Sequence, residues 1–318
     1  MTRKETTSYM KTYKDLISRW DACNGGQILV DHQHPIKNMY LNVNEKGNKE
    51  LLIPVDKPVS QFHTTEAIGI SNYKNSNTYF LAIELLIDSL INEYASLCFD
   101  IINSSRECNT QKEAVDTLFI AFRKWYYLMS DVHLEILPIN QIRGLMGEVK
   151  FILDEVTSGK SDSEVISAWT THKDAARDFI FDDTWTEIKT IQSSSDYITI
   201  SSIEQLDHDM DGYITVYKLD KANPDANEAV TLNSIINKLK EVVSTTVEPM
   251  LNHKLLAKGY VYNEDYNKFA FVFNGKSRFI VNESFPCISR DKLPAAINSA
   301  KYEIVLSRIN EWSDPNGT

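Results

Sequence analysis

Residues 178–189 read Asp178-Phe-Ile-Phe-Asp-Asp-Thr-Trp-Thr-Glu187-Ile-Lys189. This stretch predicts two short strands joined by a tight turn, with an acid on the first strand and Glu-x-Lys on the second. Side chains two positions apart on a strand share a face, so we expect Glu187 and Lys189 to project together. Asp178 beside them would supply a second carboxylate. Two carboxylates and an ammonium group are what a divalent-metal site for phosphodiester hydrolysis needs, because hard cations prefer oxygen ligands.

A helix before this stretch and two strands after it extend the pattern. Apolar positions recur at helical spacing over residues 140–157, and Gly144-Leu-Met-Gly147-Glu148 places a glutamate beside that apolar stripe. The two glycines would let a neighbouring backbone approach closely. Tyr197-Ile-Thr-Ile-Ser201 predicts a third strand, Gln205 follows it, and Tyr213-Ile-Thr-Val-Tyr217 predicts a fourth. The order of these elements indicates an α/β or α+β core.

These elements resemble the PD-(D/E)xK nuclease superfamily, and in particular a bacterial family of PD-(D/E)xK motif proteins. That family shows a Gly-Leu-x-Gly-Glu helix, an Asp-Phe strand, a Glu-x-Lys strand and a later Gln-Leu, and all four occur here in that order. The resemblance is firm over residues 140–220 and weaker in the flanking regions. It implies a restriction-endonuclease-like core with a mixed central sheet flanked by helices, an N-terminal β-rich module and a C-terminal α/β extension.

The resemblance also implies a role for each residue of the pattern. Asp178 and Glu187 would bind Mg²⁺, which Mn²⁺ could replace, and the backbone carbonyl of Ile188 would be a third ligand. Lys189 would orient or help to deprotonate the attacking water and offset the charge of the phosphate. Glu148 would hold a second metal ion or the waters of the first. The implied activity is hydrolysis of DNA that leaves 5′-phosphate and 3′-hydroxyl ends.

Further polar residues would contact the water or the DNA. Gln205 matches the polar residue that follows the third strand in the family, where it would steady the attacking water or the substrate. Families of this kind are linked to restriction or anti-phage systems, so the expected partners are DNA, a helicase, ATPase or methyltransferase, and a second copy of the chain. Basic residues near the pattern in sequence are candidates for contacts to DNA phosphates: Arg143, Lys150, Lys173 and Arg177, with His172 beside them.

Several alternatives stay open on the residues alone. Asp182 or Asp183 could replace Asp178 as a ligand, although both lie in the expected turn. The run Asp207-His-Asp-Met-Asp-Gly212 begins like an EF-hand calcium loop, but its last ligand position is Lys218 and a strand is expected there. A relative that keeps the fold and binds nucleic acid or assembles a defence complex without catalysis is the second functional hypothesis.

Composition narrows the classes of protein that remain. The 318 residues carry a net charge of −11, which counts against a protein that coats nucleic acid through a broad basic surface. No window approaches about 18 uninterrupted apolar residues, and the start lacks an apolar signal region, so we expect a cytoplasmic protein without a membrane span. Four dispersed cysteines favour thiols over a zinc site. His32 and His34 are expected to be solvated in a loop.

Turn-rich connectors predict three regions. Residues 1–110 would form a mixed β-rich module, residues 111–222 the nuclease core, and residues 223–318 a helical and strand extension packed on that core. The apolar patterns predict separate strands within these regions, near residues 27–30, 39–43, 51–55, 79–86, 269–273, 277–281 and 302–307.

Overall fold

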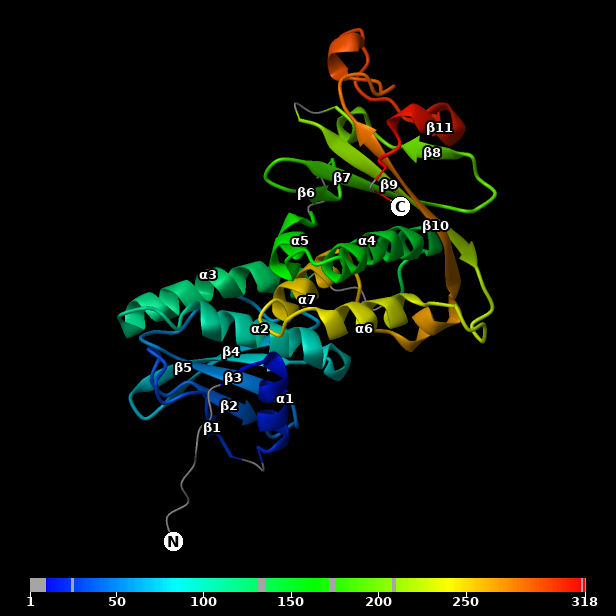
Figure 1. Cartoon of the computed structure of the whole chain (residues 1–318). Coiled ribbons are helices and arrows are strands. Elements are labelled where there is room, and N and C mark those ends of the chain that lie inside the picture. Colours follow the sequence, from blue (N-terminus) through cyan, green and yellow to red (C-terminus); the bar gives the residue numbers. More distant parts are fainter. Residues whose placement is uncertain are drawn as a thin grey trace. The chain divides into compact units, whose positions relative to one another are not determined.

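The chain folds into two compact units, each built from separate stretches of sequence. The computed structural model (Figure 1) describes residues 10–23, 26–130, 135–171, 176–207, 210–315 and 317. Unit 1 comprises Met1–Leu134 and Glu248–Tyr262, and unit 2 comprises Glu135–Val247 and Asn263–Thr318. This division differs from the predicted boundaries at residues 110 and 222. The chain therefore enters each unit twice, and the second stretch of unit 1 is short.

Unit 1 contains an antiparallel sheet with the strand order β1-β2-β3-β5-β4. The run Asn44-Glu-Lys-Gly-Asn joins β2 to β3 in a hairpin, and Val43 pairs with Lys49 across it. Gly47 has a φ of +87° in this turn, a conformation that side chains disfavour. The strands span Ile28–Leu29 (β1), Tyr40–Val43 (β2), Lys49–Val55 (β3), Ile68–Asn75 (β4) and Thr78–Leu85 (β5).

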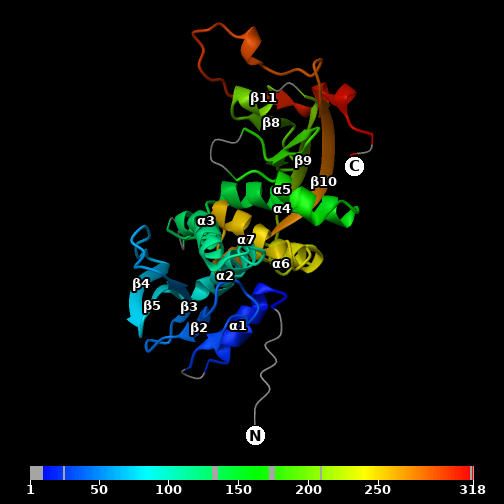
Figure 2. The same ribbon diagram turned by 90° about the vertical axis from the view of Figure 1, so that its left-hand side faces the viewer.

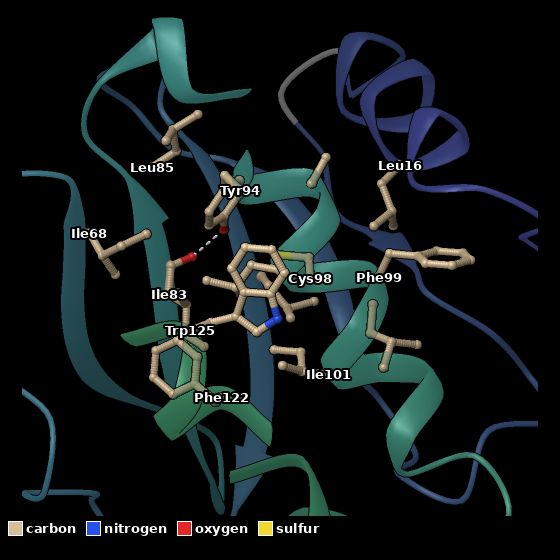
Figure 3. Close-up of a cluster of buried hydrophobic side chains, with 14 of the residues drawn as sticks. Leu16, Ile68, Ile83, Leu85, Tyr94, Cys98, Phe99, Ile101, Phe122 and Trp125 are labelled. Carbon is tan, nitrogen blue, oxygen red and sulfur yellow. Dashed lines mark hydrogen bonds between the residues drawn. The ribbon is translucent and has the colours of Figure 1, made fainter. Parts of the chain in front are cut away.

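Apolar side chains from helices and strands form the core of unit 1. Its helices are α1 (Tyr13–Asp21), α2 (Ile91–Ser104), α3 (Gln111–Ser130) and α7 (Glu248–Ala257). Figure 3 shows α2 side chains such as Tyr94 and Ile101 meeting Phe122 and Trp125 of α3 and Ile83 of β5. The Tyr94 hydroxyl is buried in this cluster and donates a hydrogen bond to the Ile83 carbonyl at 2.6 Å. The unit therefore has a hydrophobic core of its own.

Helix α7 lies within the residues that we predicted to form the C-terminal extension, whereas the structure groups it with unit 1. Glu248 and Asn252 of α7 are both 2% exposed. Glu248 Oε1 accepts a hydrogen bond from the Tyr13 hydroxyl at 2.9 Å, and Asn252 Nδ2 donates to Ser96 Oγ at 2.8 Å. These partners lie more than a hundred residues away in sequence, so the local pattern of α7 carries no sign of them.

The loop histidines differ from our expectation in one case. His32 is exposed as expected, but His34 is fully buried. Its Nδ1 accepts a hydrogen bond from the Ile36 amide at 3.0 Å, and its Nε2 lies 2.9 Å from the Ile102 carbonyl. These contacts require neutral imidazole with the proton on Nε2. Burial lowers the pKa of His34, and its hydrogen bond with Ile102 opposes that shift.

We expect His34 to make unit 1 less stable at acidic pH. The lowered pKa means that the unfolded chain binds a proton on this side chain at a higher pH than the folded chain does. The stability that neutral His34 contributes is therefore fully present above the ordinary histidine pKa. It is lost as the pH falls from there toward the pKa of His34 in the folded chain. His34→Asn keeps an acceptor for Ile36 but leaves Ile102 without a donor, which costs about 1–3 kcal/mol. Between pH 7.5 and pH 5.5, the melting temperature of wild type should fall by more than that of His34→Asn. An equal fall in the two proteins would contradict this prediction.

Unit 2 contains a mixed sheet with the strand order β10-β9-β7-β6. β7 and β9 are parallel, whereas β6–β7 and β9–β10 are antiparallel. This arrangement confirms the predicted α/β (α+β) class with a mixed central sheet. The predicted strands near 269–273 and 277–281 are one strand, because β10 continues along β9 through an irregularity between Phe273 and Gly275. The strands span Phe179–Ile180 (β6), Trp185–Ile191 (β7), Gly212–Lys221 (β9) and Phe271–Val281 (β10).

The two faces of this sheet have different coverings. Helix α4 (Ile139–Thr157) lies beside the sheet in Figures 1 and 2, and Gly147 of α4 faces Ile188 and Thr190 of β7. The opposite face carries Trp185, which packs with Ile198 and Ile304. Those residues belong to a separate two-stranded pair, β8 (Tyr197–Ile200) and β11 (Tyr302–Val305). Helices α5 (Asp162–Ala168) and α6 (Leu232–Val242) complete unit 2. Across the described ranges, no helix is long and apolar enough to cross a membrane.

Candidate active site

The strand register brings Asp178 and Glu187 together. Phe179 pairs with Thr186 and Ile180 with Trp185 in the β6–β7 hairpin, so one further step of the same register sets Asp178 opposite Glu187. Beyond this pairing the Ile188 amide donates to Asp178 Oδ2 at 2.8 Å. A side chain thus replaces a backbone acceptor where the two strands stop pairing. The Asp178 carboxylate is held beside β7 by the backbone of the strand that carries Glu187.

Glu187, Lys189 and Gln205 form a closed ring of hydrogen bonds. Lys189 Nζ donates to Glu187 Oε1 at 2.7 Å and to Gln205 Oε1 at 3.1 Å. Gln205 Nε2 donates to the same Glu187 oxygen at 2.7 Å. Gln205 lies in the 3₁₀ turn η2 (Ile203–Gln205), and the Ser201 amide fixes its Oε1 at 2.8 Å. The structure therefore brings Gln205 of the η2 turn to Glu187 and Lys189, which share strand β7.

The Glu187 carboxylate is almost completely buried, with 2% of the residue exposed. Burial raises the pKa of Glu187 to about 8; Asp178 adds to this effect, Lys189 opposes it, and Glu148 raises it further. Its Oε2 atom is buried and has no hydrogen-bond partner among the described residues. A buried unpaired carboxylate oxygen costs free energy. The site thus holds an acceptor that the protein itself does not satisfy.

Glu148 reaches this site from helix α4. Its Oε2 accepts a hydrogen bond from the buried indole Nε1 of Trp169 at 2.6 Å, and its charge acts on Glu187. Gly147 allows the helix to approach, since a Cβ there would lie 2.4 Å from Thr190 Cγ2. Gly144 has no atom within 4 Å of such a Cβ, so close approach requires only one of the two glycines in the Gly-Leu-Met-Gly-Glu run.

The alternative acids and the calcium-like loop have other surroundings. Asp182 and Asp183 are exposed in the β6–β7 turn, where the Phe181 amide donates to the Thr184 carbonyl at 2.8 Å. This favours Asp178 as the acid beside Glu187. In the EF-hand-like run, residues 208–209 lie outside the described residues, and the position of the missing last ligand, Lys218, is on strand β9.

The basic residues expected to contact DNA phosphates have partners within the protein where the structure describes them. Arg143 Nη2 donates to the Leu219 carbonyl at 3.0 Å, and Lys150 pairs with Asp154 within α4. Arg177 is 7% exposed, so its predicted role at the DNA surface is wrong. His172 and Lys173 lie outside the described residues.

Sequence reasoning missed the residues that support the site. Trp169 holds Glu148 from a distance of 21 residues, and Trp185 lies on the same strand as Glu187 and Lys189. No rule of sequence spacing would have identified either tryptophan as part of the site. The only signal in the sequence was the occurrence of a large aromatic residue near each predicted acid.

As they lie in the structure, the carboxylates of Asp178, Glu187 and Glu148 do not form a metal centre. Within the described parts of the chain, no three His, Cys, Asp or Glu side chains are arranged so that they could hold a metal ion. At least one of Asp178, Glu187 and Glu148 must therefore turn toward the others for all three to share a cation. The donor set itself consists of carboxylate oxygens, which suit hard divalent cations.

Comparison with protein families gives one match. The family described as "Putative PD-(D/E)XK family member, (DUF4420)" matches residues 10–307, which include both units and every residue of the candidate site. No curated protein and no solved structure matches the chain significantly. Because the match covers nearly the whole chain and the strand–helix framework agrees with it, the protein belongs to this PD-(D/E)XK family.

Proposed function

We propose that this protein is a metal-dependent nuclease that hydrolyses phosphodiester bonds of DNA. The observation that carries the proposal is the buried, unpartnered Oε2 of Glu187 beside Asp178 and Lys189. A hard divalent cation is the ligand that would satisfy such an oxygen. Asp178, Glu187 and Glu148 fit this ion as oxygen donors, with the Ile188 carbonyl as a further ligand. Mg²⁺ is the proposed ion, and Mn²⁺ would replace it.

The side chains of the site have distinct roles in this proposal. When bound, a divalent cation supplies Lewis-acid stabilisation of the negative charge on the phosphate. Lys189 Nζ donates one hydrogen bond to Glu187 and one to Gln205. Its third N–H is then available for a hydrogen bond to the attacking water or to a phosphate oxygen. The water oxygen forms a bond to phosphorus and gives up a proton to solvent, the bond from phosphorus to O3′ breaks, and the 3′ oxygen takes up a proton from solvent. The products carry 5′-phosphate and 3′-hydroxyl ends.

The second candidate is a nuclease-fold subunit without catalysis that binds nucleic acid or assembles a defence complex. It is favoured by the finding that no three metal-ligating side chains of the described residues are arranged as a metal site. For either candidate, the family resemblance suggests anti-phage defence or restriction. A helicase, ATPase or methyltransferase, or a second copy of the chain, is the proposed partner.

Incubation with DNA separates the two candidates. Supercoiled plasmid and linear DNA are mixed with purified protein in Mg²⁺, in Mn²⁺ and in EDTA. We expect cleavage in either metal and none in EDTA, and ligase should rejoin the products without prior phosphorylation. Binding of DNA without cleavage in both metals would instead support the inactive subunit. Nicked or linear plasmid would identify an endonuclease, whereas loss of linear DNA alone would identify an exonuclease.

A further inference from the structure

Arg177 is a buried cation directly before Asp178 in the chain. Its guanidinium carbon lies 4.7 Å from the centroid of the Trp185 ring, and its Nη2 donates to the Asp207 carbonyl at 2.7 Å. A planar guanidinium can stack on an aromatic ring and donate in its own plane at the same time, which an ammonium group cannot do. The side chain is therefore fixed by two contacts of different kinds.

The Asp207 carbonyl belongs to the turn that carries Gln205. The Leu206 and Asp207 amides both donate to the Ile203 carbonyl at 3.2 Å. Asp207 Oδ2 also accepts a hydrogen bond from the Arg290 amide at 2.9 Å. Arg177 thus connects the backbone beside Asp178 to the end of the turn whose Gln205 contacts Glu187 and Lys189.

We propose that Arg177 is a positioning residue for the nuclease site, which holds the Gln205 turn against Glu187 and Lys189 and places a positive charge near the buried carboxylate of Glu187. This inference rests on the proposed function, because it assigns Arg177 to the same reaction. Arg177 contacts neither the scissile phosphate nor the water in this proposal. It acts through Asp207 and Gln205.

Two further observations support the proposal. Burial lowers the pKa of Arg177, while the charges of Glu187 and Asp207 oppose that shift, so the guanidinium lies within electrostatic reach of the site. Its Nε is buried without a hydrogen-bond partner among the described residues. A buried charge with an unpaired donor is costly for folding. A role in the site accounts for this cost better than stability does.

The test compares Arg177→Ala with Arg278→Ala. Arg278 is the matched control because its guanidinium also stacks on an aromatic ring of unit 2, with its carbon 3.7 Å from the centroid of Tyr213. We expect Arg177→Ala to lower kcat by about 10- to 100-fold with KM nearly unchanged, and Arg278→Ala to retain wild-type kcat. Millimolar guanidinium should restore part of the lost kcat in Arg177→Ala only, because it can occupy the space that the side chain leaves. Wild-type kcat in Arg177→Ala would overturn the inference.

Hydrogen–deuterium exchange tests the same contact without any activity. Amides of residues 203–207 should exchange faster in Arg177→Ala than in wild type, and at the wild-type rate in Arg278→Ala. Unchanged exchange would overturn the positioning role even if the wild-type enzyme cleaves DNA. If Arg177→Ala exchanges faster than wild type but the wild-type protein cleaves no DNA, the contact between Arg177 and the turn stands and the nuclease function is rejected instead.

Discussion

Lys189→Met is expected to slow metal-dependent DNA cleavage by about 100-fold or more while the chain stays folded. Lys189 Nζ donates to Glu187 at 2.7 Å and to Gln205 at 3.1 Å. Methionine keeps the apolar stem of the side chain but has no charge and no donor. The substitution therefore opens the ring of hydrogen bonds and removes the donor that would hold water or phosphate. Initial rates of plasmid cleavage in Mg²⁺, at equal concentrations of folded protein, measure the effect.

Lys268→Met is the control for this variant. Lys268 pairs with Asp265 at 2.6 Å, and the two side chains are 71% and 52% exposed. Such surface pairs contribute little to stability, so this variant should cleave DNA at the wild-type rate. If Lys189→Met and wild type cleave equally fast, Lys189 is not catalytic and the cleavage has another origin, such as a contaminating nuclease.

The candidate site could be predicted from sequence because its spacing follows strand geometry. The two-residue period of a strand places Glu187 and Lys189 on one face, and the tight turn between the strands determines which residue meets Glu187. Asp178 occupies that position and Asp182 does not. Gln205 could be predicted only through the family resemblance, because its contact with Glu187 and Lys189 depends on the path of the chain after β8.

The features that could not be predicted depend on contacts with other elements of the fold. Strand β4 was missed because Gly69, Asn72 and Asn75 resemble turn residues, yet it pairs with β5 along its full length. Asn274-Gly275 likewise suggested a turn, but β9 supplies a continuous partner strand on both sides of it. Each local signal was weak or misleading, and pairing with a neighbouring strand determined the structure. The roles of Trp169 and Arg177 could not be predicted either, because their hydrogen-bond partners are 21 and 30 residues away in sequence.

Gly212→Ala is expected to destabilise unit 2 by about 3 kcal/mol, at the upper end for an added methyl group in a packed core. Gly212 pairs with Trp185 across the parallel strands. A Cβ at Gly212 would lie 2.1 Å from Cε2, 2.3 Å from Cδ2 and 2.6 Å from Cζ2 of the indole. The ring has little room to move, since it is 1% exposed and its Nε1 donates to the Met210 carbonyl at 3.0 Å. Displacing it would also remove the surface on which Arg177 stacks.

A double-mutant cycle shows whether the indole causes this effect. Trp185→Ala alone should cost about 3–5 kcal/mol through the cavity that it leaves. In that background the methyl group of Gly212→Ala meets no ring, so its further cost should fall below about 0.5 kcal/mol. Gly144→Ala is the control, because its Cβ would meet no atom within 4 Å and alanine favours a helix by up to about 1 kcal/mol. Urea denaturation followed by circular dichroism gives each free energy of unfolding. If Gly212→Ala lowers the free energy of unfolding equally in both backgrounds, the strand backbone and not the indole of Trp185 requires glycine at this position.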